Sequence, residues 1–402
     1  MMTNIELEQA AELVAAGSHP LGVESVPVSA ALGRTLAQDI AAPLDQPPFD
    51  RSPLDGYALR AADSTDASPN YPVQLTVVDT VYAGNVAAIP VKAGQAVRIM
   101  TGAMLPQGCD CILRQEDTDQ QTPVVSIFKS LKPHDNCVNR GEDYRKGSLL
   151  LPGGTRLDAS AIGLLASAGV SETLPVRRRP RVLVISTGDE VVEPSMHPLP
   201  PGKIYDANLA LLTARLAELG LTEITGRRAG DDPAALAQII RQGQEHYDLI
   251  LTTGGVSVGE KDIFHQVFPM LGAEQVFWRV KLKPGSPAMF SRYGSKPILS
   301  LSGNPFAAAA TFELLGRPLL AALSGEPHFL PQERQAVLDT PFPKASPGRR
   351  FIRGRYECGR VTLPKGHASG VLSSFLGCNC MVDIPAGSEP LERGSRVNII
   401  LL

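Results

Sequence analysis

The sequence has no excess of positive charge, and this limits the functions it can have. Its 402 residues contain 38 Lys and Arg against 41 Asp and Glu, which gives a formal net charge of −3. Proteins that hold nucleic acid through its phosphate backbone need a basic surface. We therefore expect no nucleic-acid partner, and an anionic small ligand must be bound by local groups.

Long apolar runs are also missing. No uninterrupted stretch of about 18 apolar residues occurs, the length that a membrane-spanning helix requires. The first twenty residues, MMTNIELEQAAELVAAGSHP, contain acidic side chains but no Lys or Arg, unlike the basic start of a signal peptide. These absences predict a soluble, cytoplasmic protein with no membrane partner.

Metal-binding patterns of cysteine and histidine are absent too. The six cysteines include two C-x-C pairs, Cys109 with Cys111 and Cys378 with Cys380, and neither pair has the two-residue gap usual in zinc sites. The seven histidines are scattered singly. The sequence therefore predicts free thiols and no histidine metal site.

The chain does contain enough apolar residues for several cores. Hydrophobic residues make up 43% of the sequence, and 402 residues exceed the usual size of one domain. We predict N-terminal modules over 1–178, an α/β domain over 179–325 and a small β-barrel over 326–402. The N-terminal part mixes a helix with short strands, expected at 72–79, 96–100, 110–115 and 123–130.

From Arg181 onward, strand and helix patterns alternate. The segments RVLVIST, TEITGRRAG and YDLILTTGG are strand-like, and each is followed by a helical pattern. Asp206 or Asn208 is expected to cap the first of these helices, and Asp232 with Pro233 to begin the second. The alternation predicts βαβ units and a three-layer α/β domain with a parallel sheet. Ligands of such domains bind beyond the carboxyl ends of the strands.

Glycines and carboxylates collect at those strand ends. Glycines let the backbone approach a ligand closely, and a group of carboxylates beside a phosphate is best explained by Mg²⁺ between them. For Asp189 and Asp232 a helix cap is an equal alternative. The residues in question are Gly188, Asp189 and Glu190, then Asp231 and Asp232, then Gly254, Gly255, Glu260 and Asp262.

Cations and a helix start follow further along the chain. Arg279, Lys281 and Lys283 alternate in RVKLKPGSP, which predicts three cations on one face of a strand. The segment 303–305, Gly-Asn-Pro, opens a helix whose free N–H groups would bind an anion. The alternatives are a solvated strand face and an ordinary helix start.

Ten motifs follow one another along the chain: SPLDGYALRAAD, RIMTGAMLPQGCD, RGEDYRKG, STGDE, IYDANL, GDDP, TTGGVSVGEKD, KLKPGSP, LSGNPFAA and LSSFLGCN. From about residue 5 to the C-terminus, they resemble the MoeA family of molybdopterin molybdenumtransferases, which is related to the gephyrin E domain. The resemblance implies a multidomain homodimer. Each subunit would have two interleaved N-terminal modules, with a β-rich part inserted at about 47–145, then a MogA-like domain and a C-terminal barrel.

The resemblance also implies a reaction and a site. Adenylylated molybdopterin and molybdate would give molybdenum cofactor and AMP, with Mg²⁺ required, in an active site shared between the subunits. Glu190, Asp231 and Asp262 would hold Mg²⁺ or orient the phosphates, and Asp55 and Thr101 would come from the partner subunit. The implied catalytic residues are Asp55, Thr101, Asp143, Glu190, Asp231, Asp262 and Lys283. The implied cofactor-binding residues are Gly188, Gly254, Gly255, Ser257, Arg279, Ser286, Pro287, Gly303, Asn304, Pro305, Arg353 and Ser374, of which Arg353 and Ser374 would help to bind molybdate.

The chain departs from the family pattern in three places. Ser286 stands where lysine is common, Ser302 where proline is usual, and Arg279 where many members have lysine. Arg279 keeps the charge. The loss of a cation at Ser286 removes a contact worth roughly 1.5 to 3 kcal/mol, which would weaken molybdate binding tenfold or more.

Two other functions stay open. A MogA-like adenylyltransferase would carry Gly-Gly-Thr-Gly after the third strand, where this chain has Gly254, Gly255, Val256 and Ser257. A non-catalytic pterin-binding or scaffold protein is favoured by Ser286 alone. For the transferase, a MogA-like adenylyltransferase and molybdoenzyme chaperones are the expected partners.

Overall fold

The computed structural model describes residues 1–256 and 263–402. The chain divides into two compact units. Unit 1 combines Met1–Glu24 with Arg177–Leu402, and unit 2 is Ser25–Val176. Between them the chain runs through β2 (Val23–Pro27) and β10 (Thr173–Arg177), which pair with each other.

Unit 1 is built on a seven-stranded sheet. The strands from β18 to β14 pair in parallel, and β17 runs antiparallel to both of its neighbours. The strand β11, which lies between β15 and β14, is buried at all six positions, as expected for a strand covered on both faces. In order across the sheet the strands are β1 (Met2–Ile5), β16 (Glu274–Val280), β17 (Met289–Tyr293), β18 (Lys296–Leu301), β15 (Leu249–Thr253), β11 (Val182–Thr187) and β14 (Ile224–Ala229).

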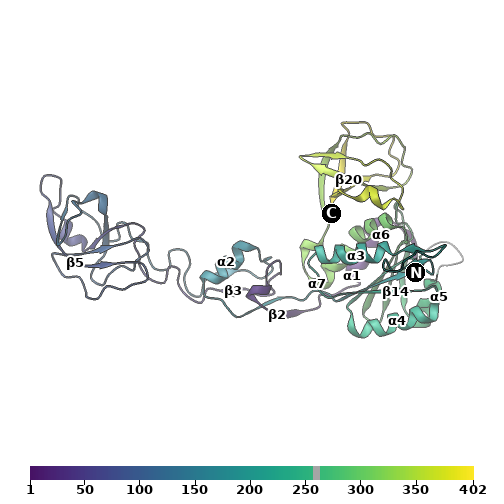
Figure 1. Cartoon of the computed structure of the whole chain (residues 1–402), viewed down its shortest axis with the longest axis horizontal. Helices are drawn as coiled ribbons and strands as arrows, with labels where there is room; N and C mark the ends of the chain where they lie inside the picture. The colour runs from purple at the N-terminus through teal and green to yellow at the C-terminus, as the bar shows by residue number, and fades with distance from the viewer. Residues whose placement is uncertain (257–262) are drawn as a thin grey trace. The chain divides into compact units, whose positions relative to one another are not determined.

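Helices cover both faces of this sheet, so the predicted three-layer α/β domain is confirmed (Figure 1). On one face α4 and α5 pack around Ile240 and Phe264, and the other helices pack around Leu212 and Phe312 on the opposite face. The helices are α1 (Leu7–Ala16), α3 (Ala207–Glu218), α4 (Pro233–His246), α5 (Phe264–Leu271), α6 (Pro305–Thr311), the π-helical turn η4 (Phe312–Gly316) and α7 (Arg317–Ser324).

Helix starts follow the cap chemistry of the sequence. Asp206 caps α3 by accepting a hydrogen bond from the Leu209 N–H at 3.0 Å. Asp232 caps α4 through the Ala234 N–H at 2.9 Å, with Pro233 as the first helical residue. The cap alternative for Asp232 is therefore confirmed, whereas Asp189 caps none of the described helices.

The first residues of the chain lie in unit 1, although the sequence groups them with the N-terminal modules. β1 extends the sheet by parallel pairing of Met2 with Phe277 and of Ile5 with Val280. The apolar face of α1, with Leu7, Ala10 and Val14, is part of the main core of unit 1. The partners of this segment are far away in sequence, and local patterns do not reveal them.

The helical run Pro305–Ser324 is long and apolar enough, by length and composition, to cross a membrane. Of this window, 89% is buried inside the protein. Phe306, Phe312 and Leu319 belong to the main core of unit 1. Core packing therefore accounts for its apolar character.

The chain ends in a closed five-stranded barrel, as predicted. Its interior is apolar, with Phe342, Ile352, Val382 and Ile399 buried together. In order around the barrel the strands are β19 (Gln332–Leu338), β21 (Arg360–Thr362), β20 (Arg350–Glu357), β22 (Cys380–Ile384) and β23 (Arg396–Leu401).

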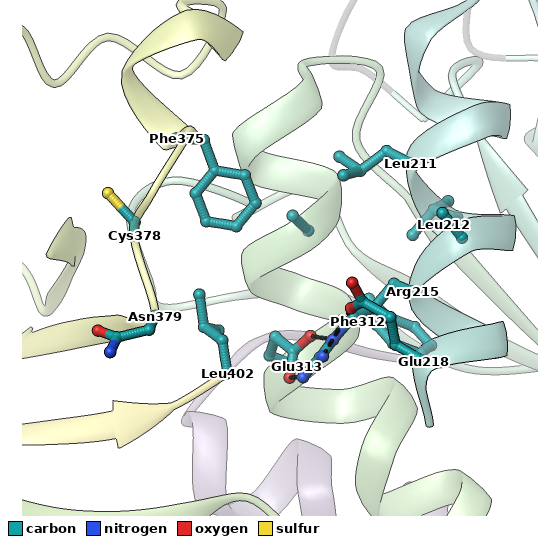
Figure 2. Close-up of a pocket in the computed structure, with 12 residues that line it drawn as sticks. Leu211, Leu212, Arg215, Glu218, Phe312, Glu313, Phe375, Cys378, Asn379 and Leu402 are labelled. Atoms are coloured by element: carbon teal, nitrogen blue, oxygen red, sulfur yellow. Dashed lines mark hydrogen bonds and ion pairs between the residues drawn. The ribbon is translucent and has the colours of Figure 1, made fainter. Parts of the chain in front are cut away.

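A cavity of about 460 Å³ lies where the barrel meets the helices of unit 1 (Figure 2). Phe375 and Cys378 line one side, and Leu211 and Leu212 of α3 line the other. Its floor is formed by η4, where Glu313 accepts hydrogen bonds from α3 and α7: from Arg215 at 2.7 and 3.2 Å, and from Arg317 at 3.2 Å.

Unit 2 contains two separate groups of elements. A five-stranded sheet is formed by β7 (Cys111–Arg114), β4 (Gly56–Leu59), β6 (Gln95–Ile99), β5 (Val73–Val81) and β8 (Val124–Ile127). A second core joins β3 (Ile40–Ala41), β9 (Leu149–Leu151) and α2 (Ala159–Ser167). Residues before and after the five-stranded sheet build this second core, so the two modules are interleaved in sequence.

All six cysteines are free thiols, as predicted. Burial raises the pKa of Cys109 to about 12 and that of Cys137 to about 11. Both are therefore protonated and unreactive at neutral pH.

Candidate active site

A cavity of about 840 Å³ lies at the carboxyl ends of β11, β14, β15 and β18 in unit 1. This is where ligands bind in open α/β sheets. The cavity brings together residues that are predicted from three separate strand ends, from the lysine turn and from the start of α6. These are Gly188, Glu190, Asp231, Gly254, Gly255, Pro287, Gly303, Asn304 and Pro305.

Glycine turns bring the strand ends together. Gly254 has φ +88°, and a Cβ atom there would lie 2.4 Å from the carbonyl oxygen of Thr187. Its N–H donates to the Leu301 carbonyl at 3.2 Å. β15 therefore turns between the ends of β11 and β18, and only glycine fits that position.

Three carboxylates line the cavity: Glu190 and Asp231 next to these turns, and Asp206 at the start of α3. Mg²⁺ is commonly held by one or two carboxylates together with substrate phosphate, and these hard oxygen donors fit that chemistry. Within residues 1–256 and 263–402, no group of three or more His, Cys, Asp or Glu is arranged to hold a metal by itself. A Mg²⁺ held by the described residues would therefore rely on the substrate to complete its shell.

The first turn of α3 forms part of the wall and was not assigned to the site from the sequence. Asn208 is 9% exposed, and its Nδ2 donates to Thr253 Oγ1 and to the Gly303 carbonyl, both at 2.8 Å. Asp206 Oδ1 accepts from Ser186 Oγ at 3.1 Å. These bonds join α3, the end of β15 and the segment before α6. The signal was present in the IYDANL motif, where both residues were considered only as helix caps.

The predicted row of three cations on one strand face is wrong. β16 ends at Val280, and Arg279 has φ +68°, which breaks the strand alternation. The Arg279 guanidinium lies over the Trp278 ring at 5.3 Å, and Lys281 Nζ pairs with Glu6 Oε1 at 2.6 Å. Side chains near the end of a strand follow local contacts and not the period of two.

Lys283 lies beside the barrel. Its N–H donates to the Arg349 carbonyl at 3.0 Å, and its carbonyl accepts from the Phe351 N–H at 2.8 Å. Pro287 lines the cavity, whereas Lys283, Ser286 and Arg279 are not among its described lining residues. The lysine turn therefore connects the cavity to the start of β20.

Arg353 of β20 and Ser374, which follows in the 3-10 turn Leu372–Phe375, are joined by a hydrogen bond. Arg353 is fully buried, and burial lowers the pKa of its guanidinium. Its Nε donates to Ser374 Oγ at 2.8 Å, and NH2 donates to the Ala368 carbonyl at 3.0 Å and the Val371 carbonyl at 3.2 Å. The guanidinium also lies 4.4 Å from the centre of the Phe306 ring, at the start of α6. These contacts hold the segment that contains Gly370, which lines the cavity.

Asp55, Thr101 and Asp143 belong to unit 2. Asp55 Oδ1 accepts hydrogen bonds from the N–H and the hydroxyl of Thr101, both at 2.7 Å. These bonds, that of the N–H first, lower the pKa of Asp55. Asp143 is exposed, and its N–H donates to the Gln46 carbonyl at 2.9 Å. The hydrogen bonds from Thr101 therefore favour the ionised form of Asp55.

Part of the predicted loop lies outside the described residues. This concerns Ser257 and Asp262, together with Glu260 and Lys261.

Three family models match successive parts of the chain. They are the MoeA N-terminal region (domain I and II) over residues 5–169, a probable molybdopterin binding domain over 183–322, and the MoeA C-terminal region (domain IV) over 335–402.

Curated relatives and solved structures agree with these matches. The chain is 35% identical over 381 residues to a molybdopterin molybdenumtransferase of Staphylococcus aureus (strain COL), covering 94% of this chain and 90% of that protein. It is 36% identical over 389 residues to that of Bacillus subtilis (strain 168), with the same coverage. A crystal structure of a molybdopterin biosynthesis MoeA protein from Pyrococcus horikoshii matches with a TM-score of 0.87 and 34% identity, covering 99% of each chain.

Proposed function

The chain belongs to the MoeA family and acts in molybdenum cofactor biosynthesis as a molybdopterin molybdenumtransferase, and from this premise we propose that the cavity at the ends of β11, β15 and β18 is its active site. Adenylylated molybdopterin and molybdate are its substrates, and molybdenum cofactor and AMP are its products. The observation that carries the proposal is the cavity itself, where glycine turns at Gly188 and Gly254 lie beside the carboxylates of Glu190 and Asp231.

The pyrophosphate of the substrate lies against the glycine turns in this proposal. Glu190 and Asp231 would hold Mg²⁺, with Asp262 as a third predicted ligand. The ion would neutralise charge on the phosphates. A turn without side chains lets the phosphate approach the main chain. The N–H groups of Gly188 and Gly254 donate to carbonyls within the protein, so the turns would supply mainly space for the phosphate. Asn208 holds Thr253 and Gly303 in the cavity wall through its two hydrogen bonds.

The molybdate end is assigned to the segment from the lysine turn to the barrel. Lys283 would supply a cation and Ser286 a hydroxyl donor, which suit a tetrahedral dianion. The Ser374 hydroxyl donates to the Val371 carbonyl at 2.8 Å, so it would have to leave that carbonyl to bind molybdate. Arg353 supports this region through Ser374 and Phe306. Arg279 contributes positive charge near the substrate, and Pro287, Asn304 and Pro305 form the wall.

We assign the wider context by the same premise. The enzyme is a cytoplasmic homodimer in which Asp55, Thr101 and Asp143 of one subunit complete the site of the other. The division into N-terminal modules, an α/β domain and a barrel remains part of this proposal. A MogA-like adenylyltransferase supplies the substrate, and molybdoenzyme chaperones receive the product.

The test is AMP release from adenylylated molybdopterin by the purified protein with Mg²⁺, with and without molybdate. Glu190→Gln is expected to lower the rate at least tenfold, because a lost charge-assisted contact is worth roughly 1.5 to 3 kcal/mol. Glu245→Gln is the matched control, since Glu245 is an exposed residue of α4 in the same unit. AMP release that does not depend on molybdate in the wild type would contradict the proposal.

A second candidate, a pterin-binding protein without turnover, is favoured by Ser286. The same assay separates it from the transferase. Tight pterin binding without AMP release, with release restored by Ser286→Lys, would indicate a binding role. Release by the wild type that Ser286→Lys only accelerates at low molybdate supports the transferase.

A further inference from the structure

Asp189 lies between two cavity residues, Gly188 and Glu190, but is not among the described residues that line the cavity. Its carboxylate instead bonds to the end of β14. Asp189 Oδ1 accepts from the Asp231 N–H at 3.0 Å, and the Asp189 N–H lies 3.4 Å from Asp231 Oδ2, which accepts from it. Each aspartate thus binds the main chain of the other, and the pair joins the ends of β11 and β14.

Neighbouring glycines leave the space that this pair needs. A Cβ atom on Gly230 would lie 2.8 Å from Asp189 Oδ1, closer than such contacts allow. A Cβ atom on Gly188 would lie 2.8 Å from Glu190 Oε2, and Gly188 has φ +139°. Both side chains therefore keep their places only while residues 188 and 230 are glycine.

The main chain of the 188–190 turn is held from other directions as well. Lys203 Nζ donates to the Asp189 carbonyl at 2.6 Å. The Gly188 N–H donates to the Ala229 carbonyl at 3.2 Å, and the Ile204 N–H donates to the Glu190 carbonyl at 2.8 Å. These bonds hold the main chain of the turn independently of Asp231, so the Asp189 side chain can orient that residue.

We propose that Asp189 is a positioning residue that holds the Asp231 carboxylate in place in the cavity and thereby sets the Mg²⁺-dependent binding of the nucleotide phosphate. This inference rests on the proposed function. The role of Asp189 is that of a hydrogen-bond acceptor, since its Oδ1 binds an N–H group. An asparagine amide oxygen can accept the same bond, so the negative charge is not required.

The experiment measures AMP binding by calorimetry with and without Mg²⁺. In the presence of Mg²⁺, Asp189→Ala is expected to bind AMP at least about tenfold more weakly than wild type. Asp189→Asn is expected to stay within about twofold of the wild-type affinity, because the hydrogen-bond acceptor is kept. Gly230→Ala displaces the Asp189 side chain without changing any charge, so it is expected to match Asp189→Ala. Circular dichroism checks that each variant is folded.

The outcomes separate this inference from the proposed function. Equal losses in Asp189→Asn and Asp189→Ala would mean that the charge is needed and that Asp189 binds the metal itself. Wild-type affinity in both Asp189→Ala and Gly230→Ala would show that Asp231 needs no support. Either result overturns the inference while wild-type AMP release stands. A wild type with neither Mg²⁺-dependent AMP binding nor molybdate-dependent release would overturn the proposed function and the inference together.

Discussion

At the scale of single residues, the site depends on positions where a side chain is missing and on polar groups that bind the main chain. The sequence predicted the glycines, because runs of glycine after an apolar strand are a local signal. It did not predict Asn208 as a site residue, because its two bonds reach Thr253 and Gly303, which are distant in sequence. A helix cap can be predicted from neighbouring residues in the sequence. The long-range hydrogen bonds of the Asn208 side chain can be known only once the fold is known.

Gly254→Ala tests the first of these features. The added Cβ would meet the Thr187 carbonyl at 2.4 Å with the backbone at φ +88°, so the strand ends have to separate. We expect nucleotide binding to fall at least tenfold, and the free energy of unfolding to fall by more than the roughly 1 to 2 kcal/mol of a left-handed alanine. Calorimetry with AMP and urea denaturation measure the two effects.

The control is Gly272→Ala, at the end of α5. Gly272 also has a positive φ, +63°, but a Cβ there meets no atom within 4 Å. It therefore carries the backbone strain without the clash, and AMP binding is expected to be unchanged. Equal effects of the two substitutions would mean that the close approach at Gly254 is unimportant.

At the scale of elements, several strand starts are held together by one buried carboxylate. Asp248, 2% exposed, precedes β15 and accepts from Arg178 NH2 at 2.9 Å, from the Arg181 N–H at 3.0 Å, and from Lys296 Nζ at 3.3 Å. Burial by itself raises the pKa of Asp248, but the Arg181 N–H and the Arg178 guanidinium outweigh it, so the pKa lies below its usual value.

Asp248→Asn is expected to lower the free energy of unfolding by about 2 kcal/mol at pH 7, because three partly buried cations lose the charge of their buried partner. The native pKa lies below the unfolded one, so this stability is present above about pH 3.9 and is lost as the pH falls through the native pKa. The difference between variant and wild type should therefore shrink below about pH 4. Urea denaturation at pH 7, 5, 4 and 3 measures it.

Asp66→Asn is the control for this series, since Asp66 is exposed in unit 2. It should change stability by less than about 0.5 kcal/mol at each pH. A constant difference for Asp248→Asn from pH 7 to pH 3 would contradict the ion-pair explanation.

Most elements of unit 1 can be predicted from periodicity and helix caps in the sequence. The first strand, β1, and the end of β16 cannot. The buried strand VLVIST and the caps at Asp206 and Asp232 are local signals, and the structure places them as predicted. β1 has only one buried residue out of four, so its strand character comes from pairing with β16. The end of β16 is set by the positive φ of Arg279, which alternation cannot predict.

At the scale of the whole molecule, Arg317 connects the helical layer of unit 1 to the barrel. It is 5% exposed, and its guanidinium donates to the Phe329 and Leu330 carbonyls before the barrel and to the Leu401 carbonyl in β23. Glu313 joins it to Arg215 along the floor of the 460 Å³ cavity between α3 and the barrel (Figure 2). Family motifs identify the barrel, but they do not indicate what attaches it.

Arg317→Met should lower the free energy of unfolding by about 3 kcal/mol, because one buried and two partly buried carbonyls lose their donor and Glu313 loses one cation. It should also speed proteolysis of the segment around Phe329. Arg360→Met is the control, since it removes only a solvent-exposed pair with Asp339, which is screened by water and contributes little to stability. Equal destabilisation by both would show that Arg317 does not attach the barrel. Urea denaturation measures the first property, and limited chymotrypsin digestion, which cleaves after aromatic residues such as Phe329, measures the second.

The order of the chain also determines the order in which its parts can fold during synthesis. β1 pairs with β16, so the first strand made has no partner until the ribosome has produced unit 2 and most of the sheet. At roughly 5 to 20 residues per second, this interval is on the order of tens of seconds. Unit 2 can close its own cores within that time, while the apolar face of α1 waits without a core to join. Among the described elements, β1 and α1 therefore have the longest exposure to chaperones and to aggregation.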